Sequence, residues 1–247
     1  MAEFGLPQVE FSSLLGHLDE LRRRLIWIAV FLAASTVAAY FYAPRLLLQM
    51  AGSTLKQMVF LSPSEAFFAQ IKIAVAVGAI ITLPMALWHL WRFISPSLNR
   101  RQRRLGFLLV PISFLLFVGG VTFAYFLIIP AAMRFFLTFA GDNLEAMITV
   151  NNYISFVLGL ALPFGLVFEL PVLVLFLAWL GIIRPEALAK KRRYAILGIF
   201  VLAAVLTPTP DIFTQTMMAL PMIVLFEISI LIARLVWRKK RKAAVGG

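Results

Sequence analysis

The chain contains no cysteine and only two histidines. The absence of cysteine excludes disulfides, thiolate metal sites and cysteine nucleophiles. His17 and His89 lie far apart in the sequence and form no metal-ligand motif. The sequence also lacks a serine–histidine pair and a paired-acid motif of the kind that enzymes use. It therefore predicts no enzyme activity and no metal or other cofactor.

Charged residues are also scarce, and acidic ones most of all. Charged residues make up 14% of the chain and hydrophobic residues 62%, with 11 Asp and Glu against 23 Lys and Arg. Such long apolar runs indicate membrane spans rather than a soluble domain. The net charge of +12 does not indicate nucleic-acid binding, because no basic face recurs on a soluble element. The basic residues flank the apolar runs, where they reflect topology and attraction to the lipid bilayer.

The basic residues predict the topology. All but four of the 23 Lys and Arg fall within residues 22–24, 92–104, 184–193 and 234–242. Short loops rich in Lys and Arg stay on the cytoplasmic side of a membrane. Four basic patches on one side require six crossings of the cytoplasmic (inner) membrane, with both termini cytoplasmic.

We therefore expect a single integral membrane domain over residues 1–247, built only of α-helices. Leucines at helical spacing within residues 1–21 predict a cytoplasmic amphipathic helix lying at the interface. The apolar segment 44–66 is expected to form a structured cap on the external helix ends. A basic cytoplasmic tail occupies residues 235–247. The six expected spans cover approximately residues 25–43, 67–94, 105–133, 153–180, 195–207 and 213–234.

Proline and span length predict the shape of the helix array. Six of the 13 prolines lie inside the expected spans, where each kinks its helix or removes a hydrogen bond. Kinked helices favour a curved, cup-like array. The cleanly apolar part of the fifth span, residues 195–206, is roughly 18 Å long against a hydrocarbon core of about 30 Å. Helices five and six are therefore expected to form a short hairpin that thins the bilayer.

Several polar residues fall inside the expected spans. Glu169 lies in the fourth span, where a carboxyl group is rare and costly. It is either a carboxyl paired with a hydroxyl in the interior or part of a polar, water-accessible recess. Glu227 either has a function in the membrane or reaches toward the basic C-terminal patch. Lys72 is interpreted as an anchor at the external interface.

Seven segments, in order along nearly the whole chain, together resemble the TatC family, the multi-spanning receptor of the twin-arginine protein translocase. They are HLDELRRRL at 17–25, LSPSEAFF at 61–68, WRFISPSL at 91–98, FAYF at 123–126, YISF at 153–156, FGLVFELP at 164–171, and PDIFTQ at 210–215 followed by LFE at 225–227.

The resemblance implies a receptor that binds the Arg-Arg signal peptide of folded cargo proteins at the cytoplasmic face. Glu20 matches the acid that contacts the twin arginines, and Arg22 and Phe93 match positions in the same patch. Gln102 stands where the family usually carries a second acid, so we expect Asp19 to supply part of the missing charge. From the residues alone, the acids near Arg22 read as a solvated helix face paired with arginines.

The resemblance also implies partners. TatA- and TatB-type single-span proteins assemble with the receptor for export driven by the proton-motive force. Thr207, Gln215 and Thr216 match the positions where these partner helices dock, and Glu169 matches the acid lining the concave face. From the residues alone, the three docking positions are able to hydrogen-bond a neighbouring helix. Assembly of several copies of the chain into a homo-oligomer is left open.

A second interpretation is an ion-coupled small-molecule transporter that uses Glu169 and Asp211. Such transporters usually carry inverted repeats, and no internal repeat is detectable. The expected short last hairpin also argues against this class.

Overall fold

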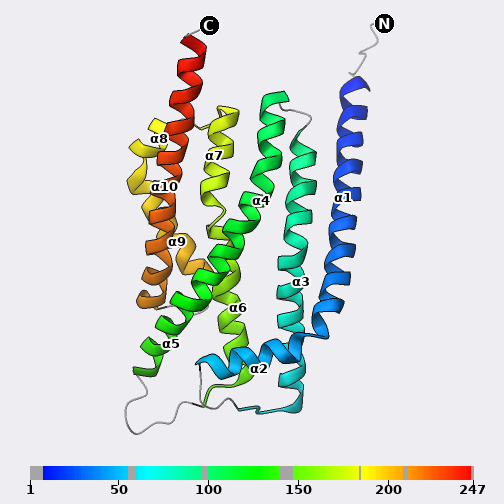
Figure 1. Ribbon diagram of the computed structural model, residues 1–247, viewed down its shortest axis with the longest axis vertical. Helices are drawn as coiled ribbons and strands as arrows, with labels where there is room; N and C mark the ends of the chain where they lie inside the picture. The colour runs from blue at the N-terminus through cyan, green and yellow to red at the C-terminus, as the bar shows by residue number, and fades with distance from the viewer. Residues whose placement is uncertain are drawn as a thin grey trace, which may run out of the picture.

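The computed structural model describes residues 8–54, 59–95, 100–138, 147–183, 185–207 and 211–245. Within these ranges the regular structure is helical, apart from an isolated bridge between Val59 and Thr149. The all-helical class is thereby confirmed. The helices, shown in Figure 1, are α1 Gln8–Tyr40, α2 Ala43–Thr54, α3 Pro63–Ile94, α4 Arg100–Phe123, the π-helix η2 Ala124–Ile128, α5 Ile129–Thr138, α6 Val150–Val167, α7 Leu170–Leu180, α8 Pro185–Lys190, α9 Arg192–Leu206 and α10 Ile212–Val245.

Five helical stretches of the described chain are long and apolar enough to cross a membrane. They are Asp19–Tyr40, Pro63–Phe93, Gly106–Thr138, Val150–Leu180 and Ile212–Trp237. Helix α9 has 15 residues, or about 22 Å, and so is short as expected. The expectation of a short last helix is wrong, because α10 has 34 residues. The first turn of α10 nevertheless lies short of the end reached by α2 and α5 (Figure 1).

The N-terminal half of the chain differs from expectation in one respect. Helix α1 continues without a break from Gln8 to Tyr40, so the expected amphipathic helix and the first span form a single helix. Helix α2 then lies across the end of the bundle (Figure 1). It buries Ala43 and Leu47 in the main core and packs on α3, as the structured-cap interpretation requires.

Two long spans are bent. A π-helix separates α4 from α5, and its wider turn redirects the chain, so that α5 leans across the bundle (Figure 1). The fourth expected span is interrupted between α6 and α7, where Phe168 and Glu169 form a turn. Pro171 follows at the start of α7 and has no N–H to donate to the preceding turn. The proline kinks predicted from sequence are therefore real at this site.

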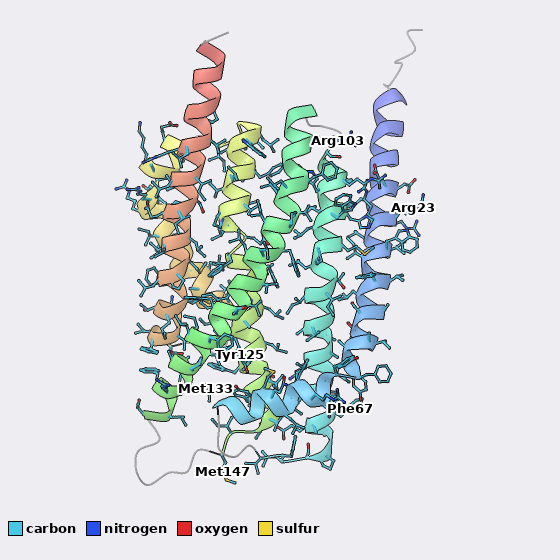
Figure 2. The ribbon with its side chains drawn as sticks, in the orientation of Figure 1. Arg23, Phe67, Arg103, Tyr125, Met133 and Met147 are labelled. Carbon is cyan, nitrogen blue, oxygen red and sulfur yellow. The ribbon has the colours of Figure 1, made fainter. Side chains whose placement is uncertain are left out.

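The packing order places α6 at the centre. Helix α1 packs on α3, which also packs on α4 and α6, while α10 packs on α7, α8 and α9. Helix α6 contributes Tyr153, Ile154, Leu160 and Phe164 to the main core, all essentially fully buried. The ends of the described chain lie at the same end of the bundle (Figure 1). Arg103 lies toward this end too (Figure 2), which we call the basic end.

Candidate functional sites

Near the basic end, an ion pair on α1 is fastened to α3. Arg24 Nε donates to Glu20 Oε1 at 3.2 Å, and Arg24 Nη2 donates to the same oxygen. Arg24 Nη1 donates to the backbone carbonyl oxygen of His89 on α3 at 2.8 Å. The Arg24 side chain is 13% exposed and the Glu20 side chain 43% exposed. The Glu20 carboxylate is thus fixed relative to α3 and still accessible from outside.

The backbone brings the other expected recognition residues to the same end. Phe93 is half-buried and lies four residues after His89, so both occupy one face of α3. Asp19 and Arg22 are exposed on α1, on either side of Glu20. Gln102 lies in the first turn of α4, but its side chain is outside the part of the structure described.

Sequence reasoning did not single out Arg24. It predicted only that acids near Arg22 pair with nearby arginines, and the Glu20–Arg24 pair confirms this. The available signal was the four-residue spacing, which places two side chains one above the other on a helix. The bond to the His89 carbonyl left no sequence signal, because every residue has a carbonyl oxygen.

A second site surrounds Glu169, at the interruption between α6 and α7. The Ser113 side chain on α4 hydrogen-bonds the Glu169 carboxyl group. The other carboxyl oxygen, Oε1, is buried and has no hydrogen-bond partner within the described residues. Burial of an unsatisfied polar oxygen is costly. The site matches the first interpretation from sequence, a carboxyl group paired with a hydroxyl in the interior. The water-accessible recess of the second interpretation stays a prediction.

Close packing holds this site against α4. Ser113, Phe117 and Gly120 follow one another at helical spacing and are all buried. A Cβ atom at Gly120 would lie 2.6 Å from the carbonyl oxygen of Phe164 and 2.8 Å from the Phe168 ring. Glycine at this position therefore allows α4 to approach the end of α6.

The expected docking residues lie on α9 and α10. Gln215 Nε2 donates to the Phe200 carbonyl oxygen at 3.0 Å and so links the two helices, as the residues alone allowed. Its role in docking partner helices stays a prediction. Thr207, the residue that follows α9, instead donates its hydroxyl to the carbonyl oxygen of Ala204 in the last turn of α9, at 3.4 Å. Thr216 is half-buried on α10.

Asp211 has a structural role that the transporter interpretation did not anticipate. Its carboxylate accepts the Thr214 backbone N–H at 2.8 Å and the Thr214 hydroxyl. Short polar side chains at this position cap a helix N-terminus. Asp211 therefore starts α10, and this observation weakens its assignment to ion coupling.

Two further polar residues pair differently from expectation. Glu227 accepts a hydrogen bond from Arg192 on α9 at 2.7 Å, a residue outside the C-terminal basic patch. Lys72 Nζ donates to Asn151 Oδ1 at 2.6 Å and to Ser155 Oγ at 2.7 Å. Lys72 therefore links α3 to α6, a role that the anchor interpretation missed. The described residues contain no group of three or more His, Asp and Glu side chains placed to hold a metal ion.

Comparison with known proteins identifies the family of the chain. A family model described as the Sec-independent protein translocase protein (TatC) matches residues 16–221. The chain belongs to the TatC family. It is 42% identical over 231 residues to TatC of Carboxydothermus hydrogenoformans, covering 92% of this chain and 95% of the relative. It is 39% identical over 230 residues to TatC of Escherichia coli K12, covering 90% and 88%.

The fold comparison gives the same result. A crystal structure titled as the twin arginine translocase receptor TatC superposes with a TM-score of 0.78 at 39% identity. The match covers 89% of this chain and 98% of that chain. Membership of the TatC family makes the chain a multi-pass membrane protein and a transport component rather than an enzyme, as the sequence predicted.

Proposed function

We propose that this chain is the receptor that binds the Arg-Arg pair of signal peptides on folded cargo proteins, with Glu20 as the principal acceptor. The observation that carries the proposal is the Glu20 carboxylate, accessible near the basic end yet fixed to α3 through Arg24. Guanidinium groups favour planar carboxylate partners, and arginine does so more than lysine. A carboxylate already held in place meets this requirement at a low cost in entropy.

Neighbouring residues complete the proposed recognition patch. Asp19 adds a second exposed carboxylate. Phe93 offers an aromatic ring, and arginine stacks favourably on such rings. Gln102 contributes a neutral amide at the start of α4, and Arg22 lies beside Glu20 on α1. This patch recognises the charged part of the peptide.

The apolar part of the signal peptide then lies against the concave helices, where Glu169 supplies a polar point within the membrane. The support is the buried Glu169 Oε1, which has no partner within the described residues. A polar group of the incoming peptide would satisfy it.

The remaining parts of the proposal concern assembly and topology. TatA- and TatB-type single-span partners dock along α9 and α10 at Thr207, Gln215 and Thr216, for export driven by the proton-motive force. Helix α9 is the short fifth of six crossings in a curved, cup-like array in the cytoplasmic membrane, with both termini cytoplasmic. Its 15 residues require a locally thin bilayer.

The central test is peptide binding to the purified full-length chain in lipid nanodiscs. A labelled peptide with an Arg-Arg motif should bind the parent chain, and Glu20→Gln should weaken binding at least tenfold, because charge-assisted hydrogen bonds are about twice as strong as neutral ones. Glu227→Gln is the matched control, since Glu227 is similarly exposed and also paired with an arginine. Equal binding by the Glu20→Gln and Glu227→Gln variants would contradict the proposal.

A further inference from the structure

Arg24 differs from the arginines beside it. Three of its nitrogens are engaged, two with Glu20 on α1 and one with the His89 carbonyl on α3. Its side chain is 13% exposed, whereas Arg22 and Arg23 are exposed. Figure 2 shows Arg23 on the side of α1 that faces away from α3. Arg24 is therefore part of the contact between α1 and α3. A basic residue that serves only membrane topology does not need such a contact.

The two groups that Arg24 joins belong to the proposed recognition patch. In an α-helix, the carbonyl of one residue accepts the N–H of the residue four positions later. The His89 carbonyl therefore belongs to the helical turn that ends at Phe93. Arg24 holds Glu20 at a fixed position relative to that turn. Both bonds from Arg24 to Glu20 end on Oε1, so Arg24 does not bind the two carboxylate oxygens in a bidentate manner.

We infer that Arg24 is a positioning residue for signal recognition: it holds the Glu20 carboxylate in the orientation that accepts a guanidinium group of the Arg-Arg pair. This inference rests on the function proposed above. Orientation matters for a planar guanidinium group, which binds as a fork, more than for a lysine ammonium group, which acts as a point charge. Arg24 therefore contributes to the preference for Arg-Arg over Lys-Lys signals.

The test compares two adjacent charge-removing variants, Arg24→Gln and Arg23→Gln, in the full-length chain in nanodiscs. Fluorescence anisotropy measures the affinities of one labelled peptide carrying Arg-Arg and of its Lys-Lys counterpart. Arg24→Gln should lower the ratio of the two affinities about tenfold, equivalent to about 1.4 kcal/mol. Arg23→Gln should leave the ratio unchanged. A purely structural defect would lower both affinities together and would leave the ratio as it was.

Several results would overturn the inference. One is an unchanged affinity ratio in Arg24→Gln, and another is an equal change in Arg23→Gln. Tighter binding of the Arg-Arg peptide by Arg24→Gln would show that Arg24 competes with the ligand instead of positioning its acceptor. Glu20→Gln separates this inference from the proposed function. If Glu20→Gln binds the Arg-Arg peptide normally, the proposed recognition site is wrong. If Glu20→Gln loses binding while Arg24→Gln keeps the parent ratio of Arg-Arg to Lys-Lys affinities, only the role inferred for Arg24 is wrong.

Discussion

Replacement of Gly106 by alanine should destabilise the packing of α3, α4 and α7 at the basic end. Trp91, at the end of α3, is only 7% exposed, and its indole ring lies directly over Gly106 on α4. Trp91 also contacts Phe176 on α7, whose ring centroid lies 5.1 Å from that of Trp91 in an edge-on arrangement. A Cβ atom at Gly106 would overlap the Trp91 ring, so the ring must move.

The expected loss follows from two contributions. Overpacking of a close-packed contact costs about 1–3 kcal/mol, and separation of an aromatic pair costs about 0.5–1.5 kcal/mol more. Alanine restores about 0.5–1 kcal/mol, because it is a better helix former than glycine. The net effect of Gly106→Ala is therefore a loss of about 0.5–4 kcal/mol, visible as a lower thermal unfolding midpoint in detergent.

Gly119→Ala is the matched control on the same helix. Nothing lies within 4 Å of a Cβ atom built at Gly119, so this variant should be neutral or slightly stabilised. A Trp91→Leu substitution should relieve the overlap in the Gly106→Ala background, so the two changes should be non-additive, as neighbouring substitutions are. Equal midpoints for Gly106→Ala and Gly119→Ala would refute the reasoning.

Two further predictions concern polar side chains at contacts between helices. Lys72→Met should lower stability by about 1.5–3 kcal/mol, because it removes charge-assisted hydrogen bonds and leaves Asn151 and Ser155 without the Lys72 donor. The thermal unfolding midpoint measures this loss. An unchanged midpoint would show that the link between α3 and α6 is weak. Glu169→Leu should raise stability by about 1 kcal/mol, because it removes an unsatisfied buried oxygen, and should reduce cargo export measured in cells. Full export by the Glu169→Leu variant would show that no polar group is needed at this position.

Charge distribution and proline positions were sufficient to predict much of the fold. Both ends of the described chain lie at the end of the bundle where Arg103 is found (Figures 1 and 2), and α9 is short because its apolar run is short. The interruption before Pro171 follows from the missing N–H of proline. The continuity of α1 was not predicted, because an amphipathic segment and an apolar span have the same helical periodicity and no proline separates them.

The partners of polar side chains were the least predictable feature. Glu227 pairs with Arg192, 35 residues earlier in the chain, because α9 and α10 pack together. Arg24 is held by a backbone carbonyl on α3, and a carbonyl oxygen has no residue-specific signature. Pairing within one helix, as between Glu20 and Arg24, was predictable from spacing. Pairing between helices depends on how the helices pack, and many residues together determine that packing.

Few acidic side chains are available to bind the arginines of a ligand. Among the acids whose side chains the structure describes, Glu65 and Asp211 accept backbone N–H groups, and Glu227 pairs with Arg192. Two exposed alternatives to Glu20 remain near the basic end, Asp19 and Glu186.

Asp19, Glu186 and Glu20 differ in where they lie on the bundle and in how they are held. Glu186 lies on α8, across the bundle from α1 (Figure 1). Asp19 lies beside Glu20 but faces outward on α1. Of the three, Glu20 has a bond network that the structure traces to α3 and hence to the turn that carries Phe93. A carboxylate fixed between two helices recognises a particular ligand geometry, whereas a carboxylate on an exposed side chain mainly contributes charge.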